Sequence, residues 1–114
     1  MTKIFCDIAD KNLIKKFSKK KIVKGFTTNP TLMRKAGAKN YVTYAKELIK
    51  FCKNKPISLE VFGDNYLEIK KQALILNKLG KNVFVKIPVV NSNGLFMGKI
   101  IKELNDKNIK LNIT

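Results

Sequence analysis

The feature that most constrains the fold is a regular alternation of short apolar runs with segments that carry apolar residues at helical spacing. Each run and the segment after it occupy about 30 residues, the length of a βα building block. Such alternation is typical of a parallel sheet covered by helices. The sequence therefore predicts one α/β domain over residues 1–114, without an internal boundary. The five predicted strands are residues 2–6, 22–26, 57–62, 83–89 and 109–114.

The segments between the strands begin and end with residues that favour helix termini. Asp10, Asn29 and Asn40 are predicted N-caps, and Pro30 suits the first position of a short helix. Further predicted boundaries are Gly37, the segment 54–56, Gly63 with Asp64, Gly80, and a turn at 91–94 before a helix that contains Phe96 and Met97.

Polar residues lie where the predicted strands end. Parallel sheets form open doubly wound sheets or closed (β/α)-barrels, and both gather functional groups at the carboxyl ends of the strands. Buried polar side chains that recur on one face of successive strands each need a hydrogen-bond partner. A purely structural role therefore explains them poorly, and a functional role is favoured. The candidate site residues are Asp7, Thr27, Asn29, Glu60, Lys86, Asn112 and Thr114.

Lys86 most needs an explanation, because it stands at the centre of the apolar run 83–89. Burial disfavours an ammonium group unless that group is paired or reaches water. Period two places Lys86 on one face with Phe84 and Pro88. An amine among apolar neighbours can act as a nucleophile that forms a Schiff base with a carbonyl substrate. The alternative is a lysine whose stem lies along apolar surface and whose head reaches water.

Three other candidates also have structural explanations. Asp7 is equally typical of a turn or capping residue, and Asn29 of a helix cap. Thr114 is the last residue of the sequence, where a strand end frays. These alternatives stay open at the level of single residues.

The composition is strongly basic, with 24 Lys+Arg against 8 Asp+Glu and a formal net charge of +16. Arg34 is the only arginine, whereas proteins that read bases or hold phosphates bidentately favour arginine. The lysines occur along all the predicted helices, and no aromatic residues alternate with Lys19, Lys20 and Lys21 as stacking platforms. We therefore interpret most of this charge as a solvated outer surface and predict no specific nucleic-acid partner.

Hydropathy, the two cysteines and the absence of histidine limit where the protein is expected in the cell and which catalytic groups it can use. No window approaches the roughly 18 apolar residues of a membrane span, and the start lacks a signal-peptide core, so we expect a cytoplasmic protein without a membrane partner. Cys6 and Cys52 form no CxxC pair, and without histidine they complete no common zinc site. We predict two reduced core cysteines, and acid/base chemistry limited to carboxylates, lysine, tyrosine or water.

Five motifs together resemble the transaldolases and their small relatives, the fructose-6-phosphate aldolases. Residues 25–32 resemble the GxTTNPSL signature, with Thr31 in place of the serine. The resemblance covers the whole chain, and five motifs in the right order at βα spacing are more specific than any one. The other four motifs are Asp7 within residues 5–10, Glu60 within 58–61, Lys86 within 85–89, and residues 111–114.

The resemblance implies a (β/α)-barrel enzyme of sugar-phosphate metabolism that carries a dihydroxyacetone unit through a lysine Schiff base. Lys86 would be the nucleophile. Asp7 would move the proton at the hydroxyl where the carbon–carbon bond breaks, and Glu60 with Thr114 would hold the catalytic water. Asn29 and Asn112 would bind the dihydroxyacetone hydroxyls.

The resemblance also implies that Thr27 lines the pocket, that sugar phosphates are the substrates, and that neither a metal nor an organic cofactor is required. Glu60 stands where the aldolase relatives can carry glutamine, which favours transfer over simple aldol cleavage. Fructose-6-phosphate aldolase activity remains the alternative within the family. A deoxyribose-phosphate type of aldolase disagrees with the Thr-Thr-Asn-Pro motif, and a basic nucleic-acid-binding α/β module is the alternative from another class.

A complete barrel has eight strands and typically about 250 residues, whereas this sequence offers five strands. The serine and arginine phosphate ligands and the aromatic site residue that the family carries later have no counterpart here. We therefore expect the amino-terminal portion of a partial barrel, apparently truncated, with little activity of its own. Open edges at its first and fifth strands would favour self-association or a complementing partner.

Overall fold

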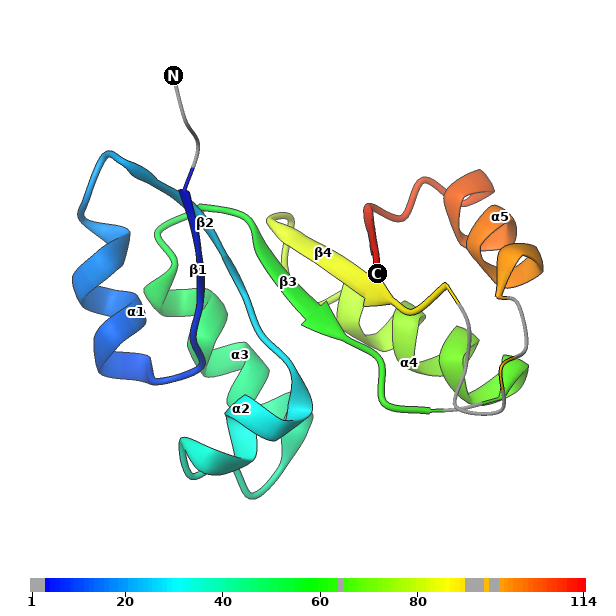
Figure 1. Ribbon diagram of the computed structural model, residues 1–114, viewed down its shortest axis with the longest axis horizontal. Helices are drawn as coiled ribbons and strands as arrows, with labels where there is room; N and C mark the ends of the chain where they lie inside the picture. The colour runs from blue at the N-terminus through cyan, green and yellow to red at the C-terminus, as the bar shows by residue number, and fades with distance from the viewer. Residues whose placement is uncertain (1–3, 64, 90–93, 95–96) are drawn as a thin grey trace.

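The computed structural model describes residues 4–63, 65–89, 94 and 97–114. Within them, five parallel strands alternate with five helices in the order β1-β2-β3-β4-β5, and the curled sheet with helices outside it forms half of a (β/α)-barrel (Figure 1), as predicted. The strands are β1 (Ile4–Asp7), β2 (Val23–Thr27), β3 (Ile57–Glu60), β4 (Val83–Ile87) and β5 (Leu111–Ile113). The helices are α1 (Lys11–Ser18), α2 (Pro30–Lys35), α3 (Tyr41–Phe51), α4 (Tyr66–Asn77) and α5 (Gly98–Asp106).

The alternation predicted for the strand that contains Lys86 is confirmed. Val83, Val85 and Ile87 are fully buried in the core that the sheet forms with the helices. Phe84 and Lys86 point to the opposite, inner face and are half-buried. Because side chains alternate along a strand, the outer residues pack the core and the inner residues remain accessible for chemistry.

The predicted caps are confirmed at three helix starts. The side chains of Asp10, Asn29 and Asn40 each accept a hydrogen bond from the backbone N–H three residues later, at 2.8 to 3.0 Å. Each bond satisfies an N–H that has no partner within the helix. At α4 the cap is Asn65, which the sequence analysis did not identify, and Asp64 lies outside the described residues.

Several predicted strand ends are wrong by one or two residues. The third strand ends at Glu60 and the fourth at Ile87. Pro88 has no N–H to donate to a ladder, which explains the fourth. The fifth strand is limited to Leu111–Ile113. The predicted turn at 91–94 lies outside the described residues except for Gly94, and so does Phe96.

Hydroxyl groups add to the backbone hydrogen bonds along one side of β3. β2 pairs with β3 through only two residues of each strand before the chain turns into α2. Beyond that point, the backbone N–H and the Oγ1 hydroxyl of Thr28 both donate to the Ser58 carbonyl, at 3.1 and 2.9 Å. The Tyr41 hydroxyl donates to the Glu60 carbonyl at 2.6 Å. A backbone N–H and a hydroxyl therefore hold the Ser58 carbonyl, and a side chain holds the Glu60 carbonyl at the end of β3.

Helix α3 uses two tyrosines in this way. Tyr41 holds the end of β3, and the Tyr44 hydroxyl donates to the Ala9 carbonyl, just after β1, at 2.7 Å. Desolvation by burial, together with the Glu60 carboxylate, raises the pKa of Tyr41 far above its ordinary value. Desolvation and Asp10 raise the pKa of Tyr44. Both hydroxyls therefore stay protonated and act as donors.

We expect Tyr41→Phe and Tyr44→Phe each to lower the free energy of unfolding by about 1–3 kcal/mol, because each leaves a carbonyl without its donor. Urea unfolding followed by circular dichroism measures the change. Tyr66→Phe is the matched control, because it removes a hydroxyl that bonds the partly exposed Glu103 carboxylate, which water can reach. A wild-type unfolding curve for Tyr41→Phe would contradict the proposed role of its hydroxyl.

Candidate active site

Three of the predicted site residues stand in one row across neighbouring strands. Lys86 of β4 is in register with Glu60 of β3 on one side and with Asn112 of β5 on the other. Strands lie about 4.8 Å apart, and residues in register on parallel strands point to the same face. The sheet therefore brings an amine, a carboxylate and an amide together on its inner face.

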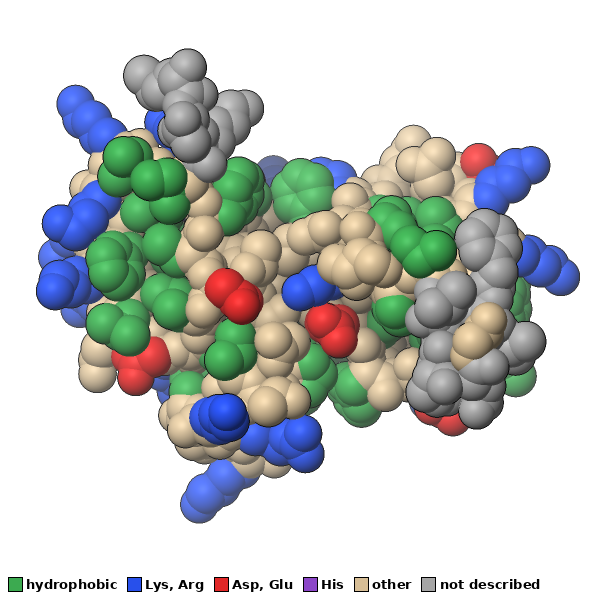
Figure 2. All heavy atoms as spheres, viewed as in Figure 1, with side chains coloured by type: hydrophobic (Ala, Val, Ile, Leu, Met, Phe, Trp, Pro, Cys, Tyr) green, Lys and Arg blue, Asp and Glu red, His purple; other side chains and the backbone are tan. Residues whose placement is uncertain are grey.

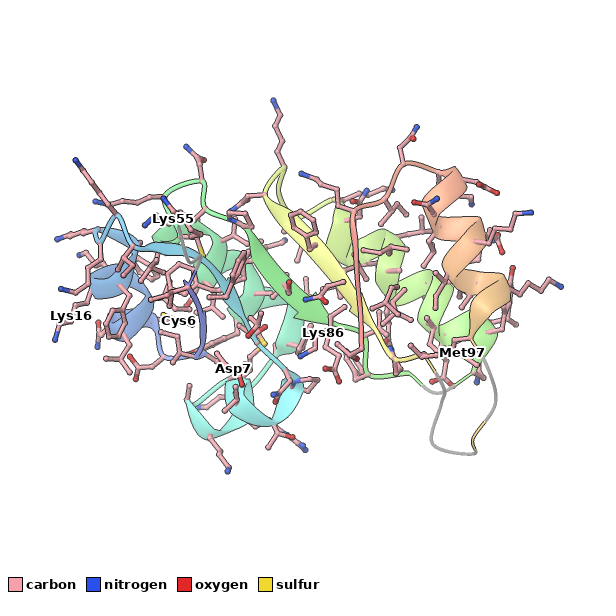
Figure 3. The ribbon with its side chains drawn as sticks, turned by 45° about the horizontal axis from the view of Figure 1, so that its top comes forward. Cys6, Asp7, Lys16, Lys55, Lys86 and Met97 are labelled. Atoms are coloured by element: carbon pink, nitrogen blue, oxygen red, sulfur yellow. The ribbon has the colours of Figure 1, made fainter. Side chains whose placement is uncertain are left out.

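Lys86 has a charged partner in this row. Its Nζ lies 3.6 Å from Glu60 Oε2, and the two side chains are 17% and 31% exposed. The carboxylate stabilises the ammonium group that apolar neighbours alone would disfavour. Figure 3 shows Lys86 near the middle of the sheet. Figure 2 shows a basic patch near the middle of one face, with an acidic patch on either side of it.

Asp7 and Thr27 form a second pair at the carboxyl ends of β1 and β2. They are in register, and the Thr27 hydroxyl donates to Asp7 Oδ1 at 3.0 Å. Thr27 is also in register with Ser58, which precedes Glu60 by two residues on β3. The Asp7–Thr27 pair therefore lies one side-chain layer closer to the amino ends of the strands than the row of Glu60 and Lys86. Asp7 is exposed, so its carboxylate is open to a ligand.

Asn112 contacts Ser58, a residue that was not predicted to belong to the site. Its Nδ2 donates to the Ser58 hydroxyl at 3.1 Å, and Ser58 is only 7% exposed. Ser58 orients the Asn112 amide across β4. The sequence could have indicated Ser58, because it precedes Glu60 by two residues and so lies on the same face of the strand. Tyr41 was also missed, and its contact with Glu60 spans 19 residues without any local sequence pattern.

Asn29 and Thr114 lie at the margins of this arrangement. The Asn29 side chain caps α2, as the structural alternative predicted, and it also lines a pocket of about 510 Å³ with Glu60, Phe62 and Pro88. Thr114 is held rather than frayed, because its carbonyl accepts from Val89 N–H at 2.7 Å and its N–H donates to the Ile87 carbonyl. Its side chain is exposed.

The two cysteines are free, and they differ in burial. Cys52 is fully buried at the end of α3, and Cys6 of β1 is half-buried. Desolvation raises the pKa of the Cys52 thiol to about 12. A thiol is nucleophilic only as the thiolate, so burial makes Cys52 inert at neutral pH. Within the described residues, no group of three or more Cys, Asp or Glu side chains is placed to hold a metal ion.

We expect Cys52 in a Cys6→Ser variant to react with iodoacetamide at pH 8 at least about tenfold more slowly in native protein than in urea. Cys6 in a Cys52→Ala variant is the control and should react in the native state. Folding raises the pKa of the Cys52 thiol, so the neutral thiol contributes fully to the free energy of unfolding below pH ~8.5. This contribution is lost as the pH rises towards about 12. Equal labelling of native and unfolded Cys52 would contradict its burial.

The comparisons with known proteins agree with the resemblance seen in the sequence. Residues 4–114 match the Transaldolase/Fructose-6-phosphate aldolase family. A probable transaldolase of Dehalococcoides mccartyi is 35% identical over 112 residues, which are 98% of this chain and 50% of that protein. Probable transaldolases of Clostridium kluyveri and Thermoplasma volcanium are each 38% identical over 98% of this chain and 49% of their own length.

This chain thus spans about half the length of the curated relatives it matches. Within the part of the chain that the structure describes, no helix has the length and apolarity to cross a bilayer. The match covers every described strand, including those that carry Lys86, Glu60 and Asp7. The chain belongs to the transaldolase/fructose-6-phosphate aldolase family.

Proposed function

We propose that this chain carries the Schiff-base site of an enzyme that transfers a dihydroxyacetone unit between sugar phosphates. The observation that carries the proposal is the row of Glu60, Lys86 and Asn112, with the Lys86 amine 3.6 Å from a carboxylate on an accessible inner face. Membership of a family whose relatives are named probable transaldolases supports the reaction class.

The chemistry assigns a step to each group. The Lys86 amine attacks the ketose carbonyl carbon, and loss of water leaves an iminium ion that withdraws electrons from the neighbouring carbon–carbon bond. A base removes the proton of the hydroxyl on the next carbon as that bond breaks, and Asp7 is the proposed base. The electron pair stays on the dihydroxyacetone unit as an enamine. An acceptor aldehyde then takes the unit in the reverse sequence, and water releases Lys86.

The other site residues have supporting roles in this proposal. Glu60 lies beside the amine, so its carboxylate can hold the water that forms and cleaves the iminium, with Thr114 as its proposed partner. Asn112 is in register with Lys86, where its amide can bind a hydroxyl of the dihydroxyacetone unit. Asn29, which lines the pocket with Glu60, and Thr27, which donates to Asp7, are the further proposed substrate contacts.

The test is borohydride reduction of the protein in the presence of fructose 6-phosphate, with the modified lysine located by peptide mass spectrometry. We expect one stable adduct on Lys86 and none in Lys86→Arg, which keeps the charge but cannot form the iminium. Lys71→Arg is the control, because Lys71 is an exposed lysine of α4. An adduct spread over many lysines, or none on Lys86, would reject the proposal. Adding an aldose phosphate distinguishes transfer from simple aldol cleavage by the product formed.

We further propose that the 114-residue chain alone has little turnover. The inner face is open to water, since the side chains of Lys86 and Glu60 are 17% and 31% exposed, and water weakens the electrostatic effects on which the iminium chemistry depends. The edge strands β1 and β5 each have one neighbour in the described sheet, and Phe5 and Ile113 are 50% and 41% exposed there. Both edges are therefore available to a complementing or second chain.

Steady-state assays with fructose 6-phosphate and an aldose phosphate check this expectation. We expect the product formed by the purified chain to stay near the background given by Lys86→Arg. Sedimentation of the same sample reports whether the edges associate. Robust turnover by a monomeric species would contradict the proposal of low activity, while leaving the trapping result to decide on Lys86.

A further inference from the structure

A hollow lined by four lysines lies at the amino ends of β2 and β3, the ends of the strands away from Lys86. It has a volume of about 400 Å³, and we call it the basic hollow. Its other lining residues are Ser18 and Val23, so none of the residues that line it is acidic. The four lysines are Lys19, Lys21, Lys24 and Lys55.

Three segments that are separate in the sequence build the basic hollow. The turn between α1 and β2 contributes Lys19 and Lys21, β2 contributes Lys24, and the segment before β3 contributes Lys55. The Lys55 ammonium donates to the Lys20 carbonyl at 2.7 Å, which links two of these segments. Figure 3 shows Lys55 at the opposite end of the strands from Asp7. The hollow therefore exists before a ligand arrives.

Lysines near a helix end can simply neutralise the last carbonyls, but two of the last carbonyls of α1, those of Lys15 and Phe17, already have donors. The Ser18 hydroxyl donates to the Lys15 carbonyl at 2.7 Å, and Lys20 N–H donates to the Phe17 carbonyl at 3.1 Å. The Lys20 carbonyl accepts from Val23 N–H and from Lys55. The ion pairs among the described residues are made by Lys11, Lys70 and Lys86, and none involves a lysine of the basic hollow.

Several like charges around one hollow repel each other, and an anion with several charges of its own offsets that repulsion. Lysine binds phosphate as a point charge, so a set of lysines suits a compact, multiply charged phosphate. No aromatic side chain lines the basic hollow, so it offers no platform on which a nucleic-acid base could stack. We propose that the basic hollow is a binding site for a small multivalent phosphate, such as a diphosphate or triphosphate group.

The test uses tripolyphosphate and the full chain at physiological ionic strength. We expect saturable 1:1 binding by calorimetry, and shifts of the Lys20 and Val23 amide signals in NMR spectra. The double variant Lys19→Gln/Lys21→Gln removes two charges from the hollow and should raise the Kd about tenfold. Circular dichroism establishes that this variant is folded.

The control accounts for the general attraction of anions to a protein of net charge +16. Lys71→Gln/Lys102→Gln removes the same charge from exposed positions on α4 and α5, and should leave the Kd within about twofold. Equal weakening by both variants would reject a defined site. A single-stranded RNA that binds more tightly and loses its affinity in Lys19→Gln/Lys21→Gln would assign the lysines to a nucleic-acid surface and overturn the small ligand. Neither result depends on the Lys86 chemistry.

Discussion

The parallel register of β3, β4 and β5 is the constraint on which the rest of the site depends. It places Glu60, Lys86 and Asn112 in one row, and a carboxylate therefore stands 3.6 Å from an amine that its apolar neighbours would otherwise disfavour. A shift of one residue along β4 would turn Lys86 into the helix-covered core and bring Val85 or Ile87 to the inner face. The apolar packing of the outer face thus fixes the chemistry of the inner face.

The end of β3 illustrates how side chains complete what the sheet leaves open. β2 departs after two paired residues; the Thr28 hydroxyl then adds a second donor to the Ser58 carbonyl, and the Tyr41 hydroxyl donates to the Glu60 carbonyl. On the other side, Val61 N–H donates to the Lys86 carbonyl at 3.1 Å. Glu60 is therefore held from both sides at the point where its strand ends, which limits the directions that its carboxylate can take.

Much of this was predictable because it follows from local rules. Period two assigned Lys86 and Val85 to opposite faces, and the caps at Asp10 and Asn40 followed from side chains that bond N–H groups three residues later. The contacts of Tyr41 with Glu60 and of Asn112 with Ser58 join residues 19 and 54 positions apart. No local pattern encodes such pairs, because they depend on how the helices and strands are placed on one another.

The alternating order of strands and helices, the inward direction of Lys86, and the set of polar strand ends that resembles one family all follow from the amino-acid sequence. These features depend on propensity and periodicity, which act over a few residues. Which polar groups meet depends on the folded arrangement: Lys86 contacts Glu60, Asp7 contacts Thr27, and four lysines surround the basic hollow. Those pairings depend on strand register and curvature, which the packing of the whole half-barrel sets.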